Sequence, residues 1–243
     1  MKRDLGSICG YYFRKLFIET PVGSMGRWLR RKTGHCGWYR NPKYWDGELA
    51  GSKASYLAGI DVDLRNAICR VLIGHFGPEV RSLLDIGCAS GELAKILSSC
   101  NIEKYVGIDI SDYAIEKARM NYDLLEGKRI PDISFHACDL CEFDPDNNSS
   151  FDAIVFNEVL YYLEPKEAIL QVERYTKTLL PKGLLLISMK DDPKSHAIFR
   201  RLRRNFSWVH GILYQEQPNG VKHRVRISVD HPAFLVGVFR KYD

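Results

Sequence analysis

No stretch of this 243-residue chain approaches the roughly 18 consecutive apolar residues that a membrane-spanning helix needs. The N-terminus also lacks the uninterrupted apolar core of a secretory signal peptide. The seven cysteines are odd in number and irregularly spaced, whereas a secreted disulfide framework has paired cysteines. We therefore expect reduced cysteines and a cytoplasmic protein.

Strong compositional bias is also missing. The chain is 45% hydrophobic and 27% charged, as is ordinary for a globular protein, and its net charge of +5 permits an anionic partner without requiring one. Cys138 and Cys141 have the C-x-x-C spacing of some metal and redox sites, but no second pair accompanies them. We therefore predict no metal site.

The most informative stretch is an apolar segment that runs into a glycine-bearing turn and then into a helix. Residues 81–86 have strand length, Gly87 and Gly91 bracket the turn, and residues 92–100 carry apolar side chains at helical spacing. Glycines let the backbone approach a ligand closely, and N–H groups at a helix start can point at that ligand. A tight structural connection is the alternative interpretation.

Three further strand-like segments, at 105–110, 133–138 and 152–156, each end in or run into polar residues. Carboxyl ends of parallel strands share one edge of an open α/β sheet, and ligands bind at that edge. A nucleotide-binding unit places an acid on ribose about 20 residues past its glycine turn. The polar residues at these strand ends are Asp109, Asp139, Asn157 and Glu158.

This ordered set resembles the class I S-adenosylmethionine-dependent methyltransferases. Residues 85–91, Asp-Ile-Gly-Cys-Ala-Ser-Gly, are similar to the family's glycine-rich loop, with Ala89 in place of its middle glycine. Residues 151–163 resemble its fourth strand and the segment that follows, and residues 181–187 resemble the start of its fifth strand. The Gly-Cys-Ala-x-Gly form, together with Glu-Val-Leu-Tyr-Tyr-Leu, is similar to the NodS-like subgroup, which N-methylates an amino sugar.

The resemblance implies a Rossmann-like, doubly wound α/β fold: a mostly parallel seven-stranded sheet with an antiparallel last strand and an N-terminal helical lid. Strand–helix alternation independently favours a parallel sheet covered on both faces. We expect residues 1–60 to form a basic, aromatic extension and lid, and residues 61–243 to form the methyltransferase domain. Helices are predicted at about 61–76, 91–100, 112–122, 165–180 and 194–204. The apolar positions of the first are Leu64, Ile68, Val71 and Leu72.

The resemblance also implies the cofactor S-adenosylmethionine, with S-adenosylhomocysteine as product. Asp85 and Gly87 would frame its methionine moiety, which Asn157 would contact from the fourth strand. Asp109 would bind the ribose and Asp139 the adenine amino group, although capping a helix or forming a turn is the alternative for both acids. The other predicted cofactor-binding residues adjoin these: Cys88, Ala89, Gly91, Ile110 and Leu140.

Acceptor-side residues are predicted from two regions. A general base is needed only if the acceptor arrives protonated, and an isolated histidine is more often structural than basic. The candidate catalytic residues are Glu158 and Tyr161 after the fourth strand, and His196 and His231 further on. Aromatic faces suit a sulfonium cation, so Tyr44, Trp45 and Tyr56 are candidates for a lid, unless they only pack on the sheet edge.

We predict in-line transfer of a methyl group to an O or N atom of a small, sugar-like or secondary-metabolite acceptor. The Asn/Asp-Pro-Pro-Tyr/Phe and Pro-Cys motifs of nucleic-acid methyltransferases are absent, so a nucleic-acid substrate is not favoured. Basic residues 1–35 leave contact with an anionic membrane surface, or an RNA or protein acceptor, as alternatives. A further alternative is a catalytically silent protein that binds the cofactor and serves as a partner or regulatory protein. The oligomeric state is not predicted.

Overall fold

A computed structural model describes residues 38–50, 60–127, 129–144, 150–215 and 233–240. The chain divides into two compact units, Met1–Tyr44 and Trp45–Asp243. The described part of the first unit holds the short helix η1 (Trp38–Arg40) and the start of α3 (Pro42–Ala50). The expected division at residue 60 between lid and domain stays a prediction.

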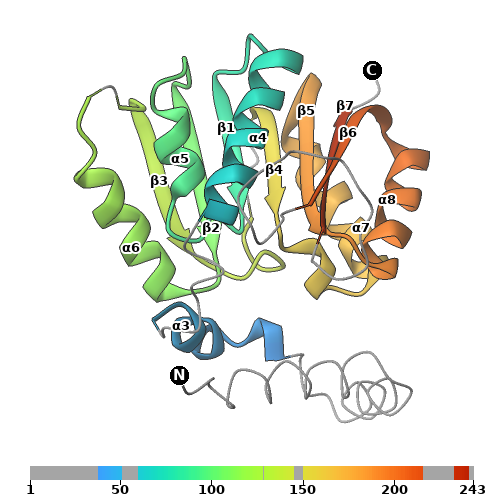
Figure 1. Ribbon diagram of the computed structural model, residues 1–243, viewed down its shortest axis with the longest axis horizontal. Helices are drawn as coiled ribbons and strands as arrows, with labels where there is room; N and C mark the ends of the chain where they lie inside the picture. The colour runs from blue at the N-terminus through green and yellow to red at the C-terminus, as the bar shows by residue number, and fades with distance from the viewer. Residues whose placement is uncertain (1–37, 51–59, 128, 145–149, 216–232, 241–243) are drawn as a thin grey trace, which may run out of the picture. The chain divides into compact units, whose positions relative to one another are not determined.

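The second unit is organised around a mixed β-sheet (Figure 1). Within the described residues its strand order is β3-β2-β1-β4-β5-β7-β6. The first five strands pair in parallel, and β7 is antiparallel to both β5 and β6. This confirms the predicted Rossmann-like sheet with an antiparallel last strand, while the number of strands in the whole chain stays a prediction. The strands are β1 (Ser82–Ile86), β2 (Lys104–Asp109), β3 (Asp132–Ala137), β4 (Phe151–Asn157), β5 (Leu179–Lys190), β6 (Ser207–Gln215) and β7 (Ala233–Arg240).

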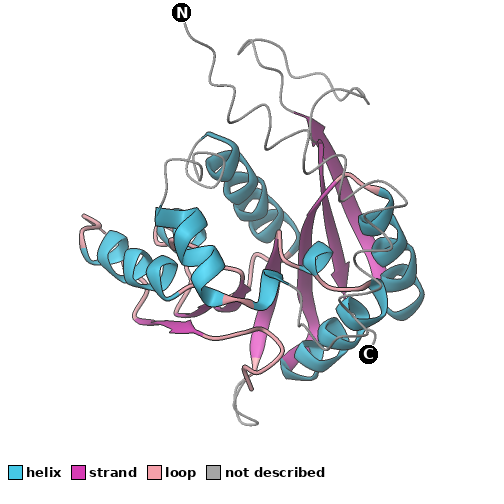
Figure 2. Cartoon of the chain, turned by 90° about the horizontal axis from the view of Figure 1, so that it is seen from below, coloured by secondary structure: helices cyan, strands magenta, loops and turns pink. Residues whose placement is uncertain are grey.

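Helices cover both faces of the sheet (Figure 2). Crossovers between parallel strands are right-handed, so steps in opposite directions along the sheet put their helices on opposite faces. The chain steps one way from β1 through α5 and α6 and the other way from β4 through α7, and this reversal between β1 and β4 is where open α/β sheets bind ligands. The helices are α4 (Ile60–Phe76), α5 (Glu92–Leu97), α6 (Asp112–Asp123), η3 (Leu160–Tyr162), α7 (Pro165–Tyr175), η4 (Thr176–Thr178) and α8 (Pro193–Asn205).

The described helices include none with the length and apolar character of a membrane span. Their ends follow from local chemistry. Ser111 caps α6 by accepting a hydrogen bond from the Ala114 amide, and Asp192 caps α8 by accepting one from the Ser195 amide. Pro165 lies in the first turn of α7, where its missing N–H costs nothing.

The helix predicted at 165–180 ends earlier than expected, at Tyr175. The hydroxyls of Thr176 and Thr178 donate to the carbonyls of Glu173 and Tyr175 and accompany a 3₁₀ turn. The chain then pairs with β4 from Leu179 onward. Threonine hydroxyls compete in this way with the helical ladder, which apolar spacing alone does not reveal.

The buried face of α4 agrees only in part with the predicted one. Leu72 is buried and Ile68 packs against the core, as predicted, but Val71 is 63% exposed. Arg65 and Asn66 are buried as well, at 7% and 2% exposed. Polar side chains therefore occupy part of the face that packs against the rest of the unit, which the apolar pattern did not indicate.

The centre of the sheet is apolar on both sides, as expected of inner parallel strands. Leu83, Leu84 and Ile86 of β1 are fully buried, and so is the carboxyl group of Asp85 between them. Its Oδ2 accepts a hydrogen bond of 2.5 Å from the Tyr105 hydroxyl, while its Oδ1 has no partner among the described residues. Burial raises the pKa of Asp85 to about 7, although the Tyr105 bond opposes the rise.

The turn after β1 is left-handed at three positions. Gly87 has φ 82°, Ala89 has φ 44° and Gly91 has φ 78°. Ala89 thus adopts a backbone conformation that favours glycine, at a steric cost of about 1–2 kcal/mol for a residue with a Cβ.

We predict that Ala89→Gly raises the free energy of unfolding by about 0.5–1 kcal/mol, because relief of this strain exceeds the added freedom of the unfolded chain. Urea denaturation measures the change. Ala197→Gly inside α8 is the control and should lower stability by about 1 kcal/mol. A loss at both positions would contradict strain at Ala89.

We also predict that stability falls as the pH rises toward 7. Between the ordinary pKa of 3.8 and the folded value of about 7, the folded protein holds a proton on Asp85 that the unfolded chain has released. This contribution is complete at low pH and is lost as the pH rises, by on the order of 1 kcal/mol per pH unit. Urea denaturation of wild type and Asp85→Asn across this range isolates it. Parallel pH profiles would show that Asp85 is ionised in the folded state.

Candidate active site

The glycine turn is fastened to the end of β2. The amides of Gly87 and Cys88 both donate to the Ile108 carbonyl, at 2.8 and 3.0 Å. The Gly91 amide donates to the carbonyl of Cys88. These three amides therefore bond within the protein, and the expectation that N–H groups at the start of α5 face a ligand stays a prediction.

Gly87 also brings the turn against the segment after β4. A Cβ at this position would lie 2.1 Å from Val159 Cγ1 and 2.9 Å from the Asn157 carbonyl oxygen. Both distances are shorter than real Cβ contacts. Glycine is thus required where the ends of β1 and β4 meet.

Asp109 lies at the carboxyl end of β2 and binds two backbone amides. Its Oδ2 accepts from Ala89 N and its Oδ1 from Ser111 N, both at 3.0 Å. Burial raises the pKa of Asp109, and these amides partly offset the rise. The carboxylate joins the glycine turn to the start of α6, and the predicted neighbour Ile110 lies between them in sequence.

A residue that the sequence reasoning missed, Asp46 of α3, reaches the same corner. Its Oδ1 accepts from the Ser111 hydroxyl at 2.6 Å and from the Tyr113 amide at 3.2 Å. Asp46 is thereby linked to the start of α6, next to Asp109.

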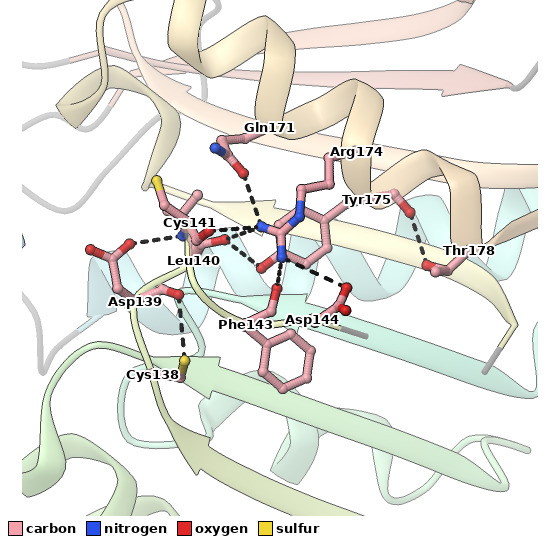
Figure 3. Close-up of polar contacts among 10 residues, drawn as sticks. All are labelled: Cys138, Asp139, Leu140, Cys141, Phe143, Asp144, Gln171, Arg174, Tyr175 and Thr178. Atoms are coloured by element: carbon pink, nitrogen blue, oxygen red, sulfur yellow. Dashed lines mark hydrogen bonds and ion pairs between the residues drawn. The ribbon is translucent and has the colours of Figure 1, made fainter. Parts of the chain in front are cut away.

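Asp139 follows β3 at the same edge of the sheet (Figure 3). Its Oδ1 accepts from the Cys141 amide at 2.8 Å, and its carbonyl accepts from the amides of Glu142 and Phe143. Leu140, the next predicted residue, turns its carbonyl toward α7. Asp85, Asp109 and Asp139 thus belong to three adjacent strands or their ends.

The end of β4 holds a second polar group that ties three elements together. Asn157 Nδ2 donates to Asn66 Oδ1 of α4 at 3.0 Å. The Ser188 hydroxyl of β5 lies 3.0 Å from Asn157 Oδ1 and 2.7 Å from Glu158 Oε1. Because this hydroxyl has one proton, it donates to one of these oxygens at a time.

The Glu158 side chain is 11% exposed in this group, and its backbone is left-handed, with φ 58°. Its Oε2 accepts no hydrogen bond among the described residues and lies 4.0 Å from Arg65 Nη1. Burial raises the pKa of Glu158, and the Arg65 cation leads the groups that lower it again. Such strain and burial concentrate at functional sites.

Aromatic rings border this second group. Trp45 meets Tyr162 edge to face with centroids 5.0 Å apart, and Tyr161 lies 4.5 Å from Tyr162. The Lys190 ammonium stands 5.5 Å from the Tyr161 ring centre. Trp45, Tyr161 and Glu158 therefore lie near one another at the carboxyl edge, the edge of the sheet where the parallel strands end. Tyr162 contacts both Trp45 and Tyr161, and Lys190 lies near both Tyr161 and Glu158.

Four predicted residues remain. His196 lies on the first turn of α8, half exposed, with Nε2 2.5 Å from Asp191 Oδ1. Tyr44 belongs to the first unit, where its amide donates to the Asn41 carbonyl. Tyr56 and His231 lie outside the described residues. Among the residues that the structure describes, no cluster of three His, Cys, Asp or Glu side chains could hold a metal ion.

Arg65, Asn66 and Ser188 were missed by the sequence reasoning. The spacing of Arg65 could have identified it. Arg65 lies four residues before the buried Cys69, so a cation shares the apolar face of a helix. A buried charge requires a partner, and that requirement pointed to a nearby acid. Ser188 inside an apolar strand left no comparable signal.

A family model described as "Methyltransferase domain" matches residues 80–225, more than half of the chain. Nodulation protein S of Azorhizobium caulinodans is 33% identical over 104 residues, 43% of this chain and 45% of that protein. A ubiquinone biosynthesis O-methyltransferase of Neisseria meningitidis is 28% identical over 127 residues, 51% of this chain and 50% of that one. The chain spans about half the length of these curated relatives.

The fold is similar to that of the N-methyltransferase NodS from Bradyrhizobium japonicum, solved in complex with S-adenosylhomocysteine, with a TM-score of 0.65 at 22% identity. That match covers 83% of this chain and 98% of the other. The chain belongs to the methyltransferase domain family, which confirms the resemblance to class I enzymes that use S-adenosylmethionine.

Proposed function

We propose that the chain transfers a methyl group from S-adenosylmethionine to an O or N atom of a small molecule. The observation that carries the proposal is the division of the carboxyl edge into two parts. Asp85 lies inside β1, Asp109 ends β2 and Asp139 follows β3, whereas a separate carboxyl group, that of Glu158, follows β4 beside aromatic rings. One part suits the cofactor and the other suits the acceptor.

The residues of the first part fit the cofactor by the chemistry of their acceptor atoms. Asp85 Oδ1 is buried without a partner and suits an ammonium group. Asp109 would hold the ribose hydroxyls and Asp139 the adenine amino group, since carboxylates accept hydrogen bonds from both. When bound, the cofactor supplies an electrophilic methyl carbon on its sulfonium sulfur.

On the acceptor side, Glu158 Oε2 takes the hydrogen bond of an acceptor hydroxyl or amine. Ser188 holds the other carboxylate oxygen, so the group keeps one orientation. The Arg65 cation favours the ionised carboxylate, which is the form that removes a proton. Trp45, Tyr161 and Tyr162 form a wall that limits water and aligns the acceptor for in-line displacement.

The relatives include both an N-methyltransferase and an O-methyltransferase, and a carboxylate base serves either kind of acceptor. His196 is assigned no proton transfer in this proposal, because its ring nitrogen is already paired with Asp191. The cytoplasmic location and the roles of Tyr44, Tyr56 and His231 stay predictions.

Cofactor binding is tested by isothermal titration calorimetry with S-adenosylmethionine and S-adenosylhomocysteine. Asp109→Ala should weaken binding by about 1–3 kcal/mol through loss of charge-assisted hydrogen bonds. Gly87→Arg should abolish it, because a Cβ alone already collides with Val159. Asp112→Ala, an exposed acid in the first turn of α6, is the matched control. A folded wild type that binds neither compound would refute the proposal.

Catalysis is tested with Glu158→Gln in a methyl-transfer assay on amino sugars and phenols. We expect kcat to fall by about 10²–10⁴-fold, the usual contribution of a positioned base, with unchanged affinity for S-adenosylhomocysteine. Glu116→Gln, exposed on α6, should leave both quantities unchanged. Full activity of Glu158→Gln would remove the base assignment, and binding without turnover on any acceptor would favour a silent cofactor-binding protein.

A further inference from the structure

The loop from Cys138 to Asp144 carries Asp139 but belongs to no helix or strand. Helix α7 lies against it (Figure 3). A loop without its own hydrogen-bond ladder depends on its neighbours for a single conformation. The side chains that supply this support come from Arg174 and Tyr175.

Arg174 donates to three carbonyl oxygens of the loop backbone. Its Nη1 lies 3.2 Å from the Leu140 carbonyl and 3.1 Å from the Cys141 carbonyl, and its Nη2 donates to the Phe143 carbonyl. The guanidinium also contacts Gln171 Oε1 at 3.2 Å and Asp144 Oδ1 at 3.9 Å. A planar fork with several fixed donors suits this arrangement, and a lysine ammonium could not reproduce it.

These contacts set the direction of the peptide that orients Asp139. In a trans peptide the carbonyl and the N–H point in opposite directions. The Leu140 carbonyl faces Arg174 and the Tyr175 hydroxyl, which is 2.7 Å away, so the Cys141 N–H faces the other way. That N–H is the donor to Asp139 Oδ1 at 2.8 Å. Arg174 therefore acts on the Asp139 carboxylate through one peptide plane.

We propose that Arg174 is a positioning residue for Asp139 and so sets the preference of the cofactor site for a base with an exocyclic amino group. This inference rests on the proposed function, in which Asp139 accepts a hydrogen bond from adenine. A carboxylate held in one plane discriminates between an amino and an oxo group, because only the amino group donates. A carboxylate free to turn away loses that discrimination.

The test compares two ligands by calorimetry: S-adenosyl-L-homocysteine and S-inosyl-L-homocysteine, in which an oxo group replaces the amino group. Wild type should bind the adenosyl compound about tenfold more tightly, the effect of one charge-assisted hydrogen bond. In Arg174→Met the ratio should fall below about threefold, mainly through weaker binding of the adenosyl compound. Arg200→Met, exposed on α8, should keep the wild-type ratio.

Circular dichroism would reveal whether Arg174→Met misfolds, and two further variants test the inference in that case. Arg174→Lys keeps the charge and loses the fork, and Tyr175→Phe removes only the hydroxyl donor to Leu140. Both should lower the ratio between the ligands, and Tyr175→Phe should do so less. If Arg174→Met does not fold, these two variants decide.

Three results would overturn the inference. Equal weakening of both ligands in the Arg174 variants would show a structural brace with no effect on base recognition. A wild type that binds both ligands equally would remove the adenine assignment of Asp139, while cofactor binding itself would stand. A folded wild type that binds neither ligand would overturn the inference together with the proposed function.

Discussion

Two backbone amides, those of Gly87 and Cys88, share the carbonyl oxygen of Ile108, and the geometry of the site depends on this contact. It holds the turn after β1 on the end of β2 and forces left-handed backbone at Gly87 and Ala89. With the turn in place, the Ala89 amide reaches Asp109 and Gly87 meets the segment after β4. The ends of three strands are thus set relative to one another by contacts of this turn.

The two parts of the carboxyl edge hold their carboxyl groups in different ways. Asp109 accepts hydrogen bonds from two backbone amides, which neutralise no charge but stabilise its ionised form, and Asp139 accepts one from the Cys141 amide. Glu158 instead lies near a buried cation, Arg65, and such pairs are retained at the expense of desolvation. The first arrangement presents acidic groups to a ligand with many donors. The second places the Arg65 cation and the Ser188 hydroxyl beside a carboxyl group whose pKa burial raises, and both favour the ionised form that removes a proton.

Much of the fold followed from local pattern. The positions of β1 to β4 in the chain were predicted from the glycines at the turn, the acids at strand ends and the helical spacing after them. Each of these signals spans only a few neighbouring residues. The errors arose where local signals compete. Thr176 and Thr178 ended α7 early through bonds to the helix backbone. On α4, exposed Val71 was placed on the buried face, and the buried polar residues Arg65 and Asn66 were missed.

The sequence by itself determined the strand–turn–helix at Gly87, the acids at the strand ends and the family to which they point, since these depend on backbone conformation and residue order. Only the tertiary structure decided which polar groups meet. Asn66 pairs with Asn157 across 91 positions, Ser188 reaches Glu158 across 30, and Arg174 supports Leu140 across 34. Such partners are chosen by the packing of helices on the sheet, because a buried polar group must find its partner in space, wherever that partner lies in the chain.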